Sequence, residues 1–194
     1  MNKWDKIFVS DPKYKPLNEL YLIKLLEKIR KEINQTPKIV VDLGCGTAET
    51  VFQFAEKGFD VTGIDFSRVA LQKLQQKIDS TNLKNIKLIY ADLNNFKINL
   101  IADIYLCHYV YSFIDDKDFF LKNMSASMKE NSIFILITPV FHKDTIYKDY
   151  DKTRIAVDFD ETQKKLNEFF TSVNVYHHDY IDFREDYVTF LIKK

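Results

Sequence analysis

Glycine is scarce in this chain of 194 residues: there are four, and none follows Gly63. Two of the four, Gly44 and Gly46, are separated by one residue in the stretch VVDLGCGTAET, residues 40–50. Glycine adopts backbone angles that are closed to other residues, and it lets a ligand come close to the main chain. The pair therefore indicates either a sharp turn or a ligand that lies against the backbone.

Several other features are missing, and each absence excludes a class of protein. The two cysteines, Cys45 and Cys107, are too few for a disulfide framework or a structural zinc site, which favours a reducing, cytoplasmic location. No window approaches the ~20 apolar residues of a membrane span, and the first residues lack the apolar centre of a secretion signal. The 28 Lys and Arg balance the 28 Asp and Glu, so no net field attracts nucleic acid or anionic lipid.

The remaining sequence predicts a single α/β domain over residues 1–194. Short apolar runs alternate with helical patterns, which indicates a doubly wound, mostly parallel sheet. The expected strands are 38–43, 59–64, 86–90, 104–108 and 133–138. The expected helices are 17–33, 50–57, 67–80, 115–128 and a last one around 161–170.

Both ends of this unit carry additions. Residues 1–37, which contain the first expected helix, are predicted to form an N-terminal helical cap. Residues 139–160 are charged and aromatic without clear periodicity, so we expect a lid or a substrate-binding insert there. The last apolar runs, 173–180 and 187–192, are joined by a polar connection that is too short for a helical crossover, which predicts a C-terminal antiparallel hairpin.

Carboxylates follow the glycine pair at the ends of the next two expected strands. Asp65 ends the second strand and Asp92 follows the third, while Asp42 ends the first. Parallel strands bring their carboxyl ends to one edge of a sheet, so these side chains are expected to lie near Gly44. One Asp at a strand end is more often a helix cap or turn residue, but three at successive ends favour a ligand site. A strand, tight turn and helix of this kind binds adenosine-containing cofactors.

Four segments together resemble the first four motifs of the class I S-adenosylmethionine-dependent methyltransferases. They are VVDLGCGTAET, GFDVTGIDFS, YADLNNF and ADIYLCHYVYSFI, in the family's order and spacing. The resemblance is close over residues 38–138 and looser to the end of the chain. It implies a Rossmann-like, seven-stranded sheet whose last strand is antiparallel. It also implies S-adenosylmethionine as methyl donor and S-adenosylhomocysteine as product.

The resemblance also assigns cofactor contacts to individual residues. Gly44, Cys45 and Gly46 would approach the methionine and adenosine parts of the cofactor through backbone atoms. Asp42 would hold the methionine ammonium group through water. Further along the chain, the residues with implied cofactor contacts are Asp65 for the ribose hydroxyls, Phe66 for the adenine face, Asp92 with Leu93 for the adenine edge, and His108 with Tyr109 for the methionine part.

A nicotinamide-dependent enzyme is one alternative for a glycine loop of this kind. Its G-x-G-x-x-G pattern requires a third glycine at the position of Glu49, where helix and strand pack closely. A carboxylate there would also repel the phosphates of a dinucleotide, whereas a sulfonium cofactor has no phosphate. A second alternative is a cofactor-binding sensor or partner subunit without turnover, which the sequence leaves open.

Methyl transfer from a sulfonium is an in-line displacement on an activated carbon, so alignment and exclusion of water are the main requirements. A base matters only if the acceptor arrives protonated. His108 and Tyr111, just past the fourth strand, are the candidate bases, with a structural role as the alternative for each. Asp115 and Asp116 fit a helix start better than a metal site, so no metal is expected.

The acceptor is inferred mainly by exclusion. Methyltransferases of nucleic-acid amino groups carry [Asp/Asn]-Pro-Pro-aromatic after the fourth strand, where this chain has HYVY, and no basic stripe is present. We therefore expect a small, partly apolar acceptor and a monomer or homodimer. The expected walls of the acceptor site are Trp4, Tyr14, Tyr109, Tyr111, Phe113, Phe141, Tyr147 and Tyr150.

Overall fold

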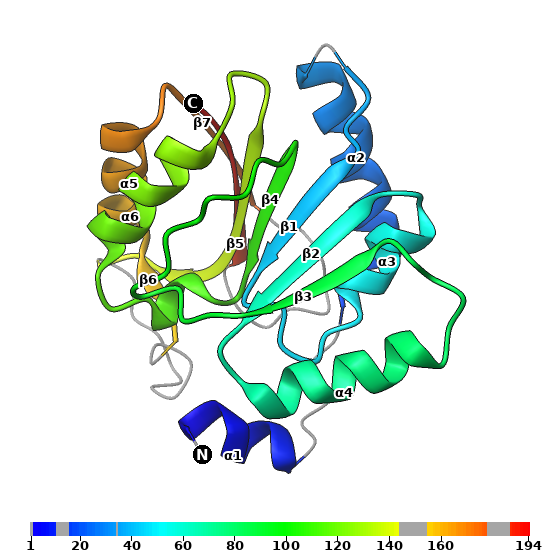
Figure 1. The fold of residues 1–194 in the computed structure, drawn as a ribbon. Helices are drawn as coiled ribbons and strands as arrows, with labels where there is room; N and C mark the ends of the chain where they lie inside the picture. The colour runs from blue at the N-terminus through cyan, green and yellow to red at the C-terminus, as the bar shows by residue number, and fades with distance from the viewer. Residues whose placement is uncertain (1, 11–15, 34, 144–154, 178–186) are drawn as a thin grey trace.

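The computed structural model describes residues 2–10, 16–33, 35–143, 155–177 and 187–194 of the chain. These residues form one sheet with helices on both faces (Figure 1). The strands lie in the order β3-β2-β1-β4-β5-β8-β7, and the short β6 pairs with the end of β5. Their bounds are β1 Ile39–Leu43, β2 Asp60–Asp65, β3 Ile86–Tyr90, β4 Ile104–His108, β5 Ile133–Phe141, β6 Val157–Asp158, β7 Ser172–His177 and β8 Tyr187–Lys193.

Strand directions confirm the expected mostly parallel sheet. β1 pairs in parallel with β2 and β4, and the pairs β2·β3 and β4·β5 are parallel as well. β8 runs antiparallel to both of its neighbours, β5 and β7, so the chain ends in the predicted antiparallel pair. The connection between β7 and β8 lies outside the described residues.

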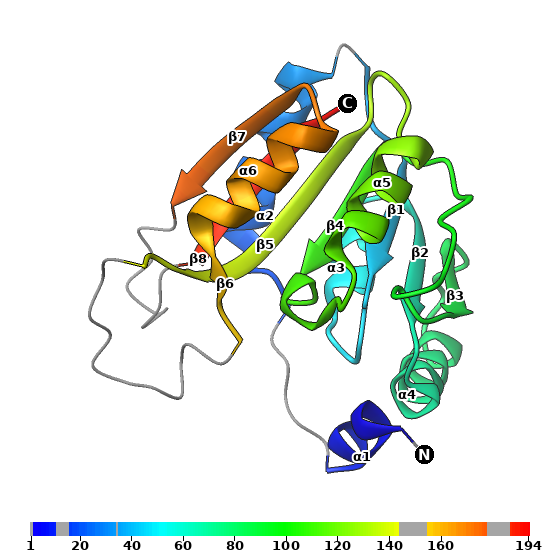
Figure 2. The same cartoon turned by 90° about the vertical axis from the view of Figure 1, so that its left-hand side faces the viewer.

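The helices form two layers. Their bounds are α1 Lys3–Val9, α2 Glu19–Glu32, α3 Thr50–Glu56, α4 Arg68–Asp79, α5 Lys117–Ser127 and α6 Phe159–Phe169, with a 3-10 turn, η1, at Tyr111–Phe113. Buried side chains of α2, α3 and α4 share one core with the sheet, and those of α5 and α6 share another. Figure 2 shows α5 and α6 on the near side of the sheet and α2 and α3 behind it. The described part of the chain has no helix long and apolar enough to cross a membrane.

Burial on both faces explains why the central strands are apolar without alternation. Val40 and Val41 are neighbours in β1, and each is almost completely buried, but Val40 packs in the α2–α4 core and Val41 in the α5–α6 core. Successive side chains of a strand point to opposite faces. A strand covered by helices on both sides must therefore be apolar at every position, as the sequence pattern predicted.

Polar side chains mark where most helices begin. Ser67, Asp116 and Asp158 each accept a hydrogen bond from a backbone N–H of the first turn of α4, α5 and α6. A side-chain oxygen at this position satisfies a donor that has no partner within the helix. These caps place the helix starts within two residues of the predicted ones.

Helix α1 was not predicted. The side-chain oxygen of Asn2 accepts the backbone N–H of Asp5, and the carboxylate of Asp5 accepts the backbone N–H of Asn2, which makes a reciprocal capping box. α1 lies beside α4 at the edge of the sheet, in both views of the molecule (Figures 1 and 2). α1 and α2 together cover most of the described residues in 1–37, and a role of this segment as a cap stays a prediction.

The stretch 139–160 is more regular than its sequence suggested where the structure describes it. Pro139, Val140 and Phe141 continue β5, and Val157–Asp158 form β6, which pairs with Val140 and Phe141. Residues 144–154 lie outside the described residues. A lid or substrate insert at 139–160 stays a prediction.

Candidate functional site

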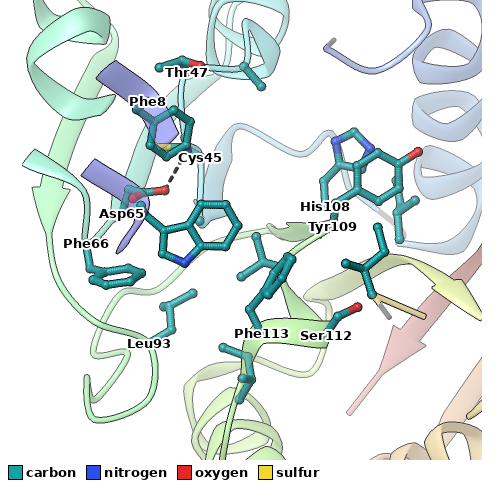
Figure 3. Close-up of a pocket in the computed structure, with 18 of the residues that line it drawn as sticks. Phe8, Cys45, Thr47, Asp65, Phe66, Leu93, His108, Tyr109, Ser112 and Phe113 are labelled. Carbon is teal, nitrogen blue, oxygen red and sulfur yellow. Dashed lines mark hydrogen bonds between the residues drawn. The ribbon is translucent and has the colours of Figure 1, made fainter. Parts of the chain in front are cut away.

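A cavity of about 1010 Å³ opens at the edge of the sheet where β1, β2, β3 and β4 end. Figure 3 shows Asp65, Phe66 and Leu93 on one side of it and His108 and Tyr109 on the other. Most of the predicted cofactor residues line it: Gly44, Cys45, Gly46, Asp65, Phe66, Asp92, Leu93, His108 and Tyr109. Asp42 and Tyr111, which were also predicted site residues, do not.

The glycine loop turns sharply at the end of β1. Gly44 and Gly46 have φ angles of 76° and 53°, in the region that favours glycine. The backbone N–H groups of Gly44 and Cys45 both donate to the carbonyl of Ile64, at 2.7 and 2.9 Å. A Cβ atom at Gly44 would lie 2.4 Å from Cγ2 of Val110, so the loop and the segment after β4 approach each other too closely for a side chain.

Substituting this glycine tests the close approach. Gly44→Ala is expected to lower the free energy of unfolding by about 3 kcal/mol, because backbone strain of ~1–2 kcal/mol adds to the overlap with Val110. Gly58→Ala is the matched control, since Gly58 has a φ of 85° but no atom within 4 Å of an added Cβ. Gly58→Ala should lower the free energy of unfolding only by the backbone strain of ~1–2 kcal/mol. Urea denaturation of both variants makes the comparison, and equal losses would show that the contact with Val110 is unimportant.

Asp65 holds the glycine loop from the end of β2. Its side chain is 8% exposed, one oxygen accepts the N–H of Gly46 at 2.8 Å, and the other accepts the N–H of Ser67 at 2.7 Å. Burial raises the pKa of Asp65, and these backbone hydrogen bonds oppose the rise. A carboxylate has about four lone-pair sites, so both oxygens can accept further hydrogen bonds from a ligand in the cavity.

Asp42 is a second buried carboxylate at this edge, and it is 3% exposed. Burial, together with the negative charge of Asp65, raises the pKa of Asp42 to about 7. Among the described residues, its carboxylate has neither a hydrogen-bond donor nor a cation as partner. Such a group is costly to ionise in the folded chain, and a bound cation would offset that cost.

A polar network fixes the rim of the cavity after β3. Asp92 accepts hydrogen bonds from the backbone N–H and the side-chain amide of Asn94, at 3.0 and 3.1 Å. The amide oxygen of Asn94 in turn accepts the N–H of Asp115 at 2.8 Å. Asn94 was not a predicted site residue, although it lies within the motif YADLNNF. It connects the loop after β3 to the start of the α5 segment.

The segment after β4 has an unusual backbone. Tyr109 has a φ of 61°, and it is the one residue other than glycine with a positive φ in the part of the chain that the structure describes. Such a conformation costs of order 1–3 kcal/mol and is found preferentially at functional sites. The Tyr109 ring lies against those of His108 and Tyr187, with centroids 4.1 and 5.0 Å apart.

Tyr111 does not reach the cavity. Its side chain is completely buried in the α5–α6 core, 6.2 Å from the ring of Phe120. Burial raises the pKa of its hydroxyl far above the usual range, and the hydroxyl has no hydrogen-bond partner among the described residues. Tyr111 therefore cannot contact an acceptor in the cavity from this position. The predicted catalytic role is not supported for it, and His108 remains the candidate.

Only some of the residues predicted to form the walls of the acceptor site line the cavity. Trp4, Tyr109 and Phe113 line the cavity, whereas Phe141 and Tyr111 do not. Tyr14, Tyr147 and Tyr150 lie outside the described residues. The lining side chains that sequence reasoning missed include Tyr21 from the first turn of α2, Ile155, and Tyr187 from the start of β8.

Charge in the cavity is mostly negative. Its described lining contains the carboxylates of Asp65, Asp92 and Asp115, against Lys3 as the sole Lys or Arg. No group of three or more His, Cys, Asp or Glu suited to a metal ion occurs among the described residues. The lining therefore suits a neutral or cationic ligand better than a polyphosphate.

A family model described as a methyltransferase domain matches residues 35–178. The ubiquinone biosynthesis O-methyltransferase of Rickettsia canadensis (strain McKiel) is 26% identical over 123 residues, which are 63% of this chain and 52% of that protein. The chain thus spans about half the length of this curated relative.

Two solved structures share the fold. An S-adenosylmethionine-dependent methyltransferase from Clostridium acetobutylicum ATCC 824 has a TM-score of 0.69 and 19% identity, covering 98% of this chain and 95% of its own. The plantazolicin methyltransferase BpumL, in complex with S-adenosylhomocysteine (SAH), has a TM-score of 0.69 and 16% identity. The match covers 88% of this chain and 81% of that chain. At these identities the similarity shows a common fold alone.

Proposed function

Because the chain belongs to the methyltransferase-domain family, we propose that it transfers the methyl group of S-adenosylmethionine to a small-molecule acceptor by in-line displacement. This proposal depends on one observation: the glycine loop and the carboxylates of Asp65 and Asp92 line the same cavity. The three features come from separate strands, and the fold brings them to one edge. S-Adenosylhomocysteine would be the product.

The residues present fit this cofactor. Gly44 and Gly46 leave the main chain without side chains at the cavity wall, and the oxygens of Asp65 suit two ribose hydroxyls. The carboxylate of Asp42, which is buried and has no partner among the described residues, fits the ammonium group of the methionine part through water. A sulfonium is cationic and carries no phosphate, which agrees with a lining whose described residues include three carboxylates and one lysine.

When bound, S-adenosylmethionine would supply a methyl group on a positively charged sulfur; a lone pair of the acceptor would form a bond to the methyl carbon while the carbon–sulfur bond breaks and its electrons stay on sulfur. The protein's own contribution is to hold the acceptor in line with that bond and to keep water out. We assign this alignment of the acceptor to His108 and Tyr109. If the acceptor is protonated, His108 is the group that takes its proton.

A small, partly apolar acceptor suits the remaining walls. Tyr21, Ile137, Ile155 and Tyr187 line the cavity from α2, β5, the segment before β6, and β8. Tyrosine combines an apolar ring with a hydroxyl that donates or accepts a hydrogen bond. A relative named as an O-methyltransferase of ubiquinone biosynthesis supports a small-molecule acceptor.

Turnover with labelled S-adenosylmethionine tests the proposal. The wild-type chain is incubated with the labelled donor and panels of phenols, amines and thiols, and release of S-adenosylhomocysteine is measured. At least one acceptor class should give turnover that depends on its concentration. Tight binding of the donor with no turnover across the panels would instead favour a sensor or partner subunit.

His108→Ala tests the assigned base once an acceptor is known. We expect kcat to fall by about 10²-fold or more with a protonated acceptor, because general base catalysis contributes about that much. His177→Ala is the control, since His177 is an exposed residue of β7 that does not line the cavity. Rapid-quench kinetics at saturating donor separates chemistry from binding. An unchanged kcat for His108→Ala would remove its catalytic role.

A further inference from the structure

Helix α1 is attached to the segment that follows Asp65. The side-chain amide of Asn2 donates to the carbonyl of Phe66 at 2.8 Å, and Asp5 accepts the hydroxyl of Ser67 at 2.7 Å. Further along α4, Lys73 donates to the carbonyl of Phe8 at 2.8 Å. Asp5 is buried, and the hydrogen bond from Ser67 lowers the pKa of its carboxyl group. A charged, hydrogen-bonded carboxylate thus fixes α1 to the start of α4.

The inner side of α1 is aromatic and faces the cavity. Trp4 and Phe8 both line it, and Phe8 is labelled among the lining side chains in Figure 3. A Cβ atom at Gly46 would lie 3.1 Å from the ring of Phe8, so this ring packs directly on the glycine loop. On the outer side of the helix, Lys6 is exposed and Val9 is 58% exposed.

Trp4 lines the cavity and contacts two other aromatic rings of its lining. Its indole makes an edge-to-face contact with Phe113 of η1, with centroids 4.8 Å apart, and it lies 6.1 Å from the ring of Phe8. Phe8 packs on the loop after β1, Phe113 belongs to the segment after β4, and the side chain of Asn2, the cap of α1, is hydrogen-bonded to the backbone after β2. α1 therefore touches three of the four segments to which cofactor contacts are assigned, those after β1, β2 and β4.

We propose that α1 is a component of the cofactor site, in which Trp4 covers the adenosyl group and docking of α1 is coupled to cofactor binding. The inference rests on the proposed function and adds Trp4 and Phe8 to the residues that hold the donor. It differs from the sequence-based expectation, in which Trp4 was a wall of the acceptor site. The anchors of α1, Phe66 and Ser67, directly follow Asp65, whose oxygens also hold Gly46 and Ser67. A ligand that fixes Asp65 and Phe66 also fixes the surface on which α1 docks, and by linkage a docked α1 strengthens binding of that ligand.

The protein contains a single tryptophan, so the emission of Trp4 reports the state of α1 directly. Titration of the wild-type chain with S-adenosylhomocysteine, without acceptor, should change the intensity and wavelength of this emission in a saturable way. Trp4→Ala should weaken S-adenosylhomocysteine binding by about tenfold or more by calorimetry, since stacking of a base on an aromatic ring is worth about that factor. Lys6→Ala, on the exposed side of the same helix, should bind as the wild type does.

A second variant tests the docking without removing Trp4. Asn2→Asp keeps a good helix cap, because Asp and Asn are equivalent there, but it loses the amide that donates to Phe66. S-Adenosylhomocysteine should dissociate several-fold faster from Asn2→Asp than from the wild type in stopped-flow displacement, and the Trp4 emission should be closer to that of a solvated indole.

The outcomes separate this inference from the proposed function. Wild-type affinity in both Trp4→Ala and Asn2→Asp, with Trp4 emission unaffected by ligand, would overturn the role of α1 and leave the proposed function intact. Absence of S-adenosylhomocysteine binding to the wild-type chain would overturn the proposed function and this inference together. Weaker binding in both variants, with Lys6→Ala unchanged, supports the inference.

Discussion

Asp65→Ala is expected to weaken binding of S-adenosylhomocysteine by at least about 100-fold, since each hydrogen bond to a charged group contributes roughly 1.5–3 kcal/mol and two ribose hydroxyls lose their acceptor. The substitution also destabilises the glycine loop, because the N–H groups of Gly46 and Ser67 lose their hydrogen-bond acceptor. No strand pairing depends on this side chain, so the fold should persist. Calorimetric titration of the purified variant gives the affinity, and circular dichroism checks the fold.

Asp60→Ala is the matched control for this substitution. Asp60 begins β2, the strand that Asp65 ends, and it is exposed at the opposite edge of the sheet. Asp60→Ala also removes one carboxylate from β2 but leaves the cavity unchanged. This variant should therefore bind S-adenosylhomocysteine with the affinity of the wild type. An Asp65→Ala variant that binds as tightly as Asp60→Ala would show that Asp65 has no part in the site.

Asp42→Asn is expected to change stability and binding in opposite directions. At pH 8 and without cofactor, the variant should be more stable than the wild type by about 2 kcal/mol. A pKa raised from 3.8 to about 7 costs up to about 4 kcal/mol once the group is ionised, and the unpaired amide of the variant returns part of that. Binding of S-adenosylhomocysteine should weaken by about tenfold or more, because its ammonium loses a buried counter-charge.

The pH dependence of this effect follows from proton binding in the two states. Below a pH of about 4, Asp42 is protonated in both the folded and the unfolded chain and contributes nothing. Between about 4 and 7, the unfolded chain releases its proton while the folded chain keeps it, so stability falls as the pH rises. Above about 7, the full cost is present. Asp42→Asn has no such proton, so this part of the slope should vanish.

Urea denaturation of the wild type and Asp42→Asn across pH 4 to 8 measures this difference. The gap in unfolding free energy between the two proteins should widen over this range. A constant gap, or a variant less stable than the wild type at pH 8, would mean that the carboxylate has a partner in solution that the structure does not contain.

Sequence reasoning correctly predicted several of the strand-end residues that line the cavity. Gly44, Asp65 and Asp92 are each defined by their place at the end of a parallel strand, and strand ends are readable from apolar runs. The direction of the sheet then brings them together without further information. The fold class was predictable for the same reason, since buried strands and amphipathic helices alternate over most of the chain.

Tyr111 was assigned wrongly to the cavity because the backbone after β4 does not continue as a strand. Tyr109 adopts a left-handed conformation, and Tyr111–Phe113 form a 3-10 turn. The side chain two residues beyond Tyr109 therefore points into the core instead of toward the ligand. A positive φ at a tyrosine has no signal in a single sequence, because it is imposed by the surrounding packing.

Helix α1 escaped prediction because seven residues do not make a stable helix alone. Its stability comes from docking on α4, through contacts between residues more than sixty positions apart. Asn2 and Asp5, a capping pair three residues apart, were the one local signal. Tyr21 and Tyr187 were missed for the related reason that α2 and β8 meet the cavity only in the folded chain.

Calorimetric titration of the wild-type chain with S-adenosylmethionine and S-adenosylhomocysteine, with NAD as control ligand, tests the central claim most directly. The claim is that the glycine loop and the carboxylates at this edge of the sheet bind an adenosyl sulfonium. We expect saturable heat from both sulfur compounds at a single site and none from NAD. Correctly folded protein that gives heat with neither sulfur compound, or with NAD alone, would contradict the account.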